Sequence, residues 1–334
     1  MKQDKAFGNG GSEKNAFFSF DGLQRPVSFS GCGDMIAELR IILRDWKFRQ
    51  ISGADAEPVI SVRKDKSGYH RESPWPAKAT TYRDPLDAAC DFVVDLVNGY
   101  VADNPGMLCL HCAAVEFSKG LVIFPAAYRA GKSTLAVALA RAGARVFTDD
   151  VLPLPEEHEK GHGKDQEKGM ALGILPRLRK PVANDAGDAF RAFTKDRRGA
   201  DSEKFLYLNL NRDELAPFGM MARIAGVVIP QRVSGPAALI PAGDGEAVKA
   251  LAYDNFTNGV AALDILERLH IIIKKAECYT LKYETIGQAV PRLTEKFGLD
   301  GARPLDGARP LDGARPLDGA RPLDGGRRGG RDIS

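Results

Sequence analysis

The stretch "GLVIFPAAYRAGKSTLAVALARAG", residues 120–143, decides the fold of this chain. Its first six residues form a nearly continuous apolar run that Pro125 ends, which is typical of a strand buried on both faces. Residues 132–142 are rich in Ala and Leu and predict a helix, which Gly143 stops. A strand, a tight loop and a helix therefore follow one another directly.

Two further apolar runs flank this stretch, namely "MLCLHCAAVEF" at 107–117 and "ARVFTDDVLPL" at 144–154. The first predicts a buried strand, and the second predicts another strand that closes on two aspartates. The order strand, loop, helix, strand predicts a parallel βα unit with ligands at the carboxyl ends of its strands. Strand-like and helical segments alternate up to residue 299, so the sequence predicts an α/β fold.

The loop between the strand and the helix resembles the phosphate-binding pattern G-x-x-x-x-G-K-[ST]. Lys132 would reach the β and γ phosphates, Ser133 would bind Mg²⁺, and Gly131 would let the backbone approach the phosphates. Ala126 replaces the first glycine of the pattern. A helix that merely begins with GKST is the alternative, and the preceding strand argues against it. The predicted nucleotide-binding residues are Ala126, Tyr128, Arg129, Ala130, Gly131, Lys132, Ser133 and Thr134.

The aspartate pair Asp149-Asp150 follows the strand-like residues "ARVFT" at 144–148. A carboxylate at the tip of a strand parallel to the loop's strand is well placed to hold Mg²⁺, and a second can accept a proton from an attacking hydroxyl. The alternative is that one of the two aspartates only caps the next turn.

His111 lies on the predicted strand before the loop strand, where a lone histidine is most often a core residue. Cys109 and Cys112 form a C-x-x-C on the same strand. Because residues three apart on a strand point to opposite faces, we expect two buried thiols and no redox or metal pair.

These residues together resemble the HPr kinase/phosphorylase family, and in particular its broader group of HPr kinase-like proteins. His111 stands twenty positions before Gly131, and the aspartate pair begins seventeen positions after Lys132, as in that family. The resemblance spans residues 105–297 and is strongest at 110–154. It implies the P-loop fold variant shared with phosphoenolpyruvate carboxykinases and the use of ATP and Mg²⁺.

The same resemblance implies roles for individual residues. Lys132 and Ser133 would bind the triphosphate and Mg²⁺, Asp149 or Asp150 would serve as metal ligand and as general base, and His111 would lie near the transferring phosphate. The family's loop is closer to G-x-S-G-x-G-K-S, so Ala126, Tyr128 and Arg129 depart from it. The family's C-terminal glycine- and arginine-containing signature is missing, so neither HPr as substrate nor the reverse reaction is implied.

A basic group in "PRLRKP" offers cations for a phosphate or an acidic substrate, although a solvated strand edge explains it equally well. Its members are Arg177, Arg179 and Lys180. His158 and His162 lie in a charged segment interrupted by Gly161, so we expect surface residues there and no metal pair.

The domain organisation follows from composition. We expect a disordered arm at 1–15, a small N-terminal α/β region at 16–106, and the HPr kinase-like P-loop catalytic domain at 107–298. Residues 299–334 repeat LDGARP four times and continue in a polar stretch, which predicts a disordered low-complexity tail. A short solenoid is the rival interpretation of the repeats.

The composition argues against two classes of binding partner, nucleic acids and membranes. A formal charge of +3 over 334 residues is too small to indicate that the protein binds nucleic acid. The sequence contains no run of eighteen apolar residues, which a membrane-spanning helix would need. Five sparse cysteines and no apolar leader favour the cytoplasm. The resemblance leaves a homo-oligomer open, because the parent family forms oligomers.

Three functions compete. The favoured one is a kinase that moves the γ-phosphate of ATP to a hydroxyl of a small molecule, peptide or protein. The second is a nucleotide-binding regulator or scaffold of the same fold without transferase activity, which the altered loop allows. The third, a carboxykinase-like enzyme, needs a second metal site with His and Lys ligands, and the sequence offers no convincing set.

Overall fold

The computed structural model describes residues 15–52, 57–75, 81–125, 130–156, 166–182, 184–253 and 255–299. All of them belong to one unit, Met1–Arg303, whereas a second unit, Pro304–Ser334, lies outside the described residues. Most of the predicted arm and nearly all of the repeat tail, with His158 and His162, also lie outside them. The disorder of both ends and the boundary at residue 106 therefore stay predictions.

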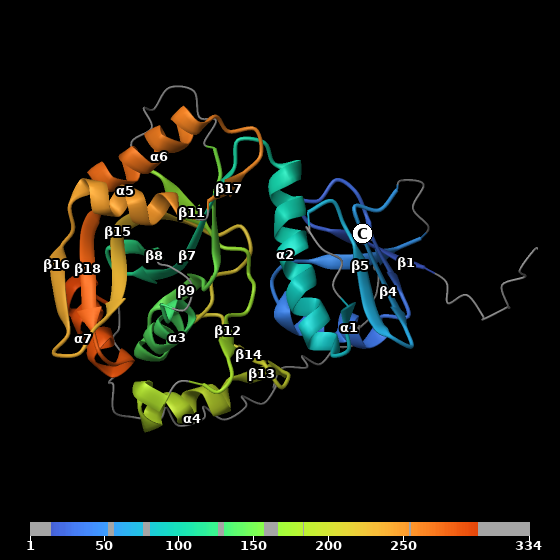
Figure 1. The fold of residues 1–334 in the computed structure, drawn as a ribbon, viewed down its shortest axis with the longest axis horizontal. Helices are drawn as coiled ribbons and strands as arrows, with labels where there is room; N and C mark the ends of the chain where they lie inside the picture. The colour runs from blue at the N-terminus through green and yellow to red at the C-terminus, as the bar shows by residue number, and fades with distance from the viewer. Residues whose placement is uncertain are drawn as a thin grey trace, which may run out of the picture. The chain divides into compact units, whose positions relative to one another are not determined.

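The fold of the described residues is mixed α/β (Figure 1). The N-terminal part forms a sheet in the order β3-β1-β2-β4-β5-β6. Its strands are β1 (Ala16–Phe20), β2 (Val27–Ser30), β3 (Phe48–Ile51), β4 (Ile60–Asp65), β5 (Gly68–Glu72) and β6 (Thr81–Tyr82). Two helices pack with it, α1 (Gly33–Ile42) and α2 (Pro85–Asp103).

The start of α2 agrees with the sequence. Asp84 is the N-cap, and its side chain accepts hydrogen bonds from the backbone N–H groups of Leu86 and Asp87, both at 2.9 Å. Pro85 occupies the first turn, where its missing N–H costs nothing. Thirteen residues of α2 are buried, because the helix packs against the N-terminal sheet on one side and the rest of the unit on the other.

The central sheet has the order β10-β7-β8-β15-β18-β16, with β9 and β17 also paired to β7 and β11 paired to β15. Its strands are β7 (Leu108–Phe117), β8 (Gly120–Pro125), β9 (Arg145–Thr148), β10 (Val151–Leu154), β11 (Lys168–Met170), β15 (Met221–Arg232), β16 (Ala238–Pro241), β17 (Phe256–Thr257) and β18 (Glu277–Tyr283). Strands β8, β15 and β18 are mutually parallel, whereas β7 runs antiparallel to β8.

The segment 144–154 is not one strand, as the sequence suggested, but two. Strands β9 and β10 both pair antiparallel with β7, and the aspartate pair forms the turn between them. Strand β9 is indeed parallel to β8, because β7 is antiparallel to both, yet β7 separates them. The acid pair consequently lies one strand away from the loop strand.

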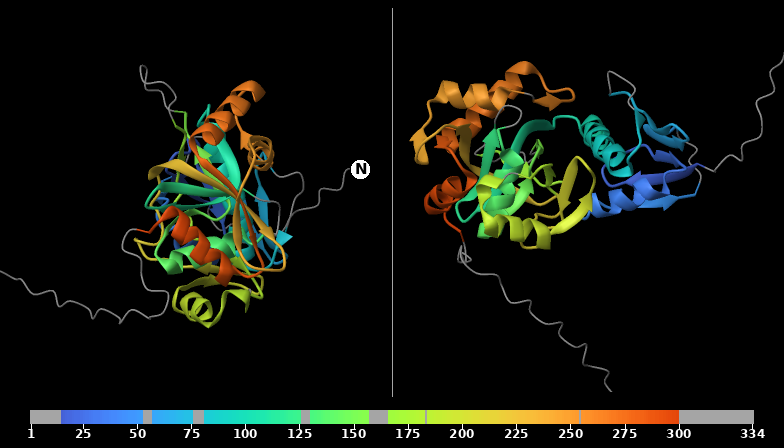
Figure 2. Two further views of the ribbon diagram at one scale, coloured as in Figure 1. Left: turned by 90° about the vertical axis from the view of Figure 1, so that its left-hand side faces the viewer. Right: turned by 60° about the horizontal axis from the view of Figure 1, so that its bottom comes forward.

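Helices cover both faces of the central sheet (Figures 1 and 2). Val122 and Phe124 of β8 join the core that holds α3 (Lys132–Ala142) and α7 (Ile286–Phe297). Leu121 and Ile123 face the opposite core, which holds α5 (Asp244–Ala252) and α6 (Ala262–Lys275). The near-continuous apolar run of β8 is therefore explained by burial on both of its faces.

A small sheet in the order β12-β14-β13 completes the unit. Its strands are β12 (Arg177–Arg179), β13 (Arg198–Asp201) and β14 (Phe205–Leu208), and α4 (Asp188–Asp196) leads into β13. This sheet contacts α2 through the side chains of Cys90 and Tyr207. None of the described helices combines the length and apolar character needed to cross a bilayer.

Candidate functional site

The site is built where β8 ends and α3 begins. Gly131 is the N-cap of α3 and has φ 84°, a left-handed conformation that a residue with a Cβ rarely adopts. Lys132 follows as the first helical residue, and its side chain is largely buried. Ala130, Gly131, Lys132, Ser133 and Thr134 are described, whereas Ala126, Tyr128 and Arg129 lie outside the described residues.

The aspartate pair occupies a turn held by Thr148. The Thr148 hydroxyl accepts hydrogen bonds from the backbone N–H groups of Asp150 and Val151, both at 3.1 Å. Thr148, and neither aspartate, therefore caps this turn.

The side chain of Asp149 contacts the first turn of α3. Its carboxylate accepts a hydrogen bond from the Ser133 hydroxyl, and a second from the backbone N–H of Arg177 at 3.1 Å. Burial and the neighbouring charge of Asp150 raise the pKa of Asp149 to about 6, although Arg177 and Ser133 oppose that rise. Burial and the neighbouring carboxylate of Asp150 therefore both disfavour the ionised form of Asp149.

His111 connects Lys132 to Asp150. The Lys132 ammonium lies 3.2 Å from His111 Nε2, and His111 Nδ1 lies 3.3 Å from the Asp150 carboxylate. An ammonium can only donate, so Nε2 accepts and the ring carries its proton on Nδ1, facing Asp150. The pairing of β7 with β10 produces this contact, because it sets His111 opposite Val151, the residue after Asp150.

The predicted basic group is divided by the structure. Arg177 lies at the site, where its guanidinium is 4.0 Å from the Asp150 carboxylate. Lys180 instead pairs with Asp201 and donates to the carbonyl of Ser202, and Arg179 is exposed. Arg177 and Lys180 therefore engage different carboxylates, Asp150 and Asp201.

Sequence reasoning missed two pairs of residues at the site. Cys90 and Tyr207 contact Arg177 or one another, although they lie far away along the chain. Arg232 and Tyr283 end the parallel strands β15 and β18 and lie beside the loop, where Tyr283 donates to the carbonyl of Ala130 at 3.2 Å. The rule that ligands bind at the carboxyl ends of parallel strands could have pointed to this second pair.

The two cysteines of the C-x-x-C point away from one another. Cys109 and Cys112 are fully buried free thiols that face different cores, as their spacing predicts. Burial raises the pKa of Cys109 to about 12 and that of Cys112 still further. No group of three or more His, Cys, Asp or Glu side chains suited to a metal occurs among the described residues.

That result is compatible with Mg²⁺ at Ser133 and Asp149. Magnesium ions in nucleotide sites take one or two protein oxygens and complete their octahedra with water and phosphate, so a three-residue cluster is not required. The hydroxyl of Ser133 and the carboxylate of Asp149 are already in contact, and both are oxygen donors. The residues present therefore fit this ion.

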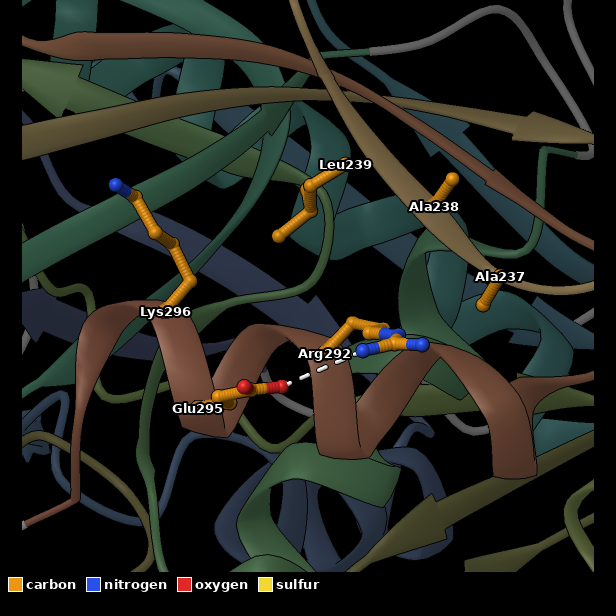
Figure 3. A pocket seen from close by; sticks show the side chains of 6 residues that line it. All are labelled: Ala237, Ala238, Leu239, Arg292, Glu295 and Lys296. Atoms are coloured by element: carbon orange, nitrogen blue, oxygen red, sulfur yellow. Dashed lines mark ion pairs between the residues drawn. The ribbon is translucent and has the colours of Figure 1, made fainter.

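A pocket of about 530 Å³ lies elsewhere, between α7 and the segment that includes β16 (Figure 3). Its lining consists of Ala237, Ala238, Leu239, Arg292, Glu295 and Lys296. None of the predicted site residues lines it.

The comparisons with known proteins identify no family for this chain. No family model matches the sequence, and no curated protein matches it. Among solved structures, the chain is similar to one described as the Hpr(Ser) kinase/phosphatase from Coxiella burnetii. The TM-score is 0.27 and the identity 12%, over 57% of this chain and 92% of that chain, which is too slight to support an argument.

Proposed function

We propose that this chain is an ATP- and Mg²⁺-dependent kinase with a P-loop core that phosphorylates a hydroxyl group. The observation that carries the proposal is the contact of Lys132, His111 and Asp150 beside the Ser133–Asp149 pair. These five side chains gather where a helix follows a buried strand, which is where phosphate groups are bound in P-loop proteins.

Phosphate binding is assigned to the start of α3. The first backbone N–H groups of a helix have no partner within it, and the helix dipole favours an anion there. Lys132 adds a full positive charge at that end, and its burial keeps the charge poorly screened. Ser133 and Asp149 would hold Mg²⁺, which supplies charge neutralisation on the phosphates when bound.

Asp150 is assigned as the general base. Its side chain is 47% exposed, so an acceptor can reach it, and the Nδ1 proton of His111 orients the carboxylate. In the reaction, a bond forms between the acceptor oxygen and the γ-phosphorus, and the bond from that phosphorus to the bridging oxygen of ADP breaks. Asp150 takes the proton that the acceptor hydroxyl loses.

The first experiment measures ATP binding by calorimetry with and without Mg²⁺, for wild type and for Lys132→Ala. We expect Lys132→Ala to weaken binding by about tenfold or more, because a buried ion pair with phosphate is lost. Lys249→Ala is the matched control, since Lys249 is an exposed lysine on α5. Equal binding by all three proteins would remove the basis of the proposal.

The second experiment follows label from γ-labelled ATP into molecules of a host extract. We expect wild type to transfer phosphate, and Asp150→Asn to bind ATP normally yet transfer about 100-fold more slowly, which is the usual contribution of a general base. A wild-type protein that binds ATP but labels nothing would instead favour the regulatory alternative of the same fold.

A further inference from the structure

Arg177 contacts both members of the acid pair. Its backbone N–H donates to Asp149 at 3.1 Å, and its guanidinium lies 4.0 Å from the Asp150 carboxylate. An arginine side chain loses considerable rotamer entropy when it is fixed. Its guanidinium therefore stays in one position only if other groups bind it there.

Two side chains contact the far side of this guanidinium, and a third contacts one of those two. Arg177 Nη1 donates to Cys90 Sγ at 2.8 Å, and the Tyr207 hydroxyl lies 2.9 Å from the same sulfur. The ring of Phe205 lies under the guanidinium, 4.9 Å from its carbon to the ring centroid. Tyr207 stands directly opposite Arg177 across the β12–β14 pair, whereas Cys90 comes from α2.

The thiol and the phenol are polar groups that meet in a buried contact. Cys90 is 4% and Tyr207 3% exposed. A buried hydroxyl costs free energy unless it is hydrogen-bonded, and the Tyr207 hydroxyl forms a hydrogen bond with the sulfur that accepts from Arg177. Both groups therefore meet at Cys90 Sγ, which contacts Arg177, and Arg177 in turn contacts the acid pair.

We propose that Cys90 and Tyr207 are positioning residues for phosphoryl transfer, which hold Arg177 against the Asp149–Asp150 pair. The inference rests on the proposed function. Arg177 offsets the repulsion between two adjacent carboxylates and keeps Asp150 directed at the acceptor. Because Cys90 belongs to α2, the N-terminal part of the chain thereby contributes to the geometry of the reaction.

The test compares the initial rate of transfer from γ-labelled ATP, with a host extract as acceptor, at low and at saturating ATP. We expect Tyr207→Phe and Cys90→Ala to lower the maximal rate by about 10- to 100-fold, because small misplacements of a catalytic group cost that much. The KM for ATP should change less than about twofold, since the hydrogen bonds of both residues in the described part of the chain go to one another and to Arg177. Cys90→Ser keeps a hydrogen-bonding atom and should restore most of the rate.

Two controls separate positioning from general structural damage. Tyr100→Phe removes the hydroxyl of a second buried tyrosine, which lies on α2 and not on β14. That hydroxyl donates to Met170 Sδ at 4.0 Å, and its removal should leave the rate unchanged. In an Arg177→Ala background, Tyr207→Phe should cause no further loss, because the two act through one group.

The outcomes are distinguishable. If wild type transfers phosphate and Tyr207→Phe is as fast as wild type, or slows the Arg177→Ala variant as much as it slows wild type, the inference is overturned while the kinase function stands. If wild type transfers nothing, the proposed function fails and the inference falls with it. A non-additive loss with Cys90→Ser rescue supports both.

Discussion

At the scale of single residues, neighbours decide what His111 does. A lone histidine on an apolar strand is most often part of the core, and the strand itself gives no reason to think otherwise. The structure sets the Lys132 ammonium against one ring nitrogen and the Asp150 carboxylate against the other. The imidazole ring therefore lies between the ammonium and the carboxylate and contacts both.

Asp149 supplies a prediction about stability and pH. Its native pKa of about 6 lies above the ordinary 3.8, so the native state binds this proton more tightly than the unfolded chain does. Protonation of Asp149 stabilises the native state fully below pH 3.8, and this stabilisation is lost as the pH rises through 6. Above that range the free energy of unfolding is lower by up to about 3 kcal/mol. Asp149→Asn should therefore be more stable than wild type at pH 7.5.

Urea unfolding in EDTA measures this effect, because chelation keeps metal from binding Asp149. Wild type and Asp149→Asn should have similar free energies of unfolding near pH 4 and should diverge toward pH 7.5. Asp264→Asn, at an exposed position on α6, serves as control and should follow wild type throughout. A gap that stays constant with pH would contradict the prediction.

At the scale of elements, the sequence was informative wherever the signal was local. The apolar run of β8, the Ala- and Leu-rich helix α3 and its glycine stop were all confirmed. The division of 144–154 into β9 and β10 was missed, because both halves are apolar and only their pairing with one partner strand separates them. Register across strands, which a single sequence does not reveal, places His111 near Asp150.

The two ends of α3 offer a matched pair of substitutions. Gly131 and Gly143 have φ of 84° and 109°, so alanine at either position is strained and should destabilise the protein by about 1 kcal/mol or more. At Gly131 the added Cβ would also come within 3.4 Å of the Arg232 guanidinium, next to the phosphate loop. We expect both variants to unfold at lower urea, but only Gly131→Ala to lose ATP affinity by calorimetry. Equal affinities in the two variants would contradict this.

The burial of strand β7 lets us predict which cysteine thiols react with a thiol reagent. Cys109 and Cys112 are fully buried and their pKa values are raised, so the thiolate that attacks a disulfide reagent is scarce and inaccessible. In native protein at pH 8, a colorimetric thiol reagent should modify Cys278, which is only partly buried, long before the other four cysteines. All five should react in guanidinium chloride. Rapid modification of Cys109 in native protein would show that the strand is not buried as described.

At the scale of the whole molecule, one hydrophobic core runs through the described residues of both predicted regions. It includes Phe29 of the N-terminal sheet, Phe92 of α2 and Leu139 of α3. Trp46 packs against Phe218 from the other region, with ring centroids 5.2 Å apart. The sequence could suggest two regions from composition, but contacts between residues more than a hundred positions apart leave no local pattern.

Arg268 provides the last prediction, because it ties together segments that are distant in the chain. Its guanidinium donates to both carboxylate oxygens of Glu167, at 2.8 and 2.7 Å, and to the carbonyls of Gly106 and Leu154. The two side chains are 7% and 10% exposed. Arg268→Met keeps an apolar stem of similar length but leaves a buried carboxylate without its partner, which costs about 3–5 kcal/mol of stability.

Urea unfolding of three variants tests this role. Arg268→Met should lose most stability, the double variant with Glu167→Gln should recover part of it because no buried charge remains, and Arg292→Met should change little. Arg292 is the control because it forms a surface pair on α7 with a 54% exposed side chain. ATP affinity should persist in all folded variants, since α6 covers the face of the sheet opposite α3. If the double variant is less stable than Arg268→Met, the buried carboxylate is not the source of the loss, and the carbonyl contacts of Arg268 must account for it instead.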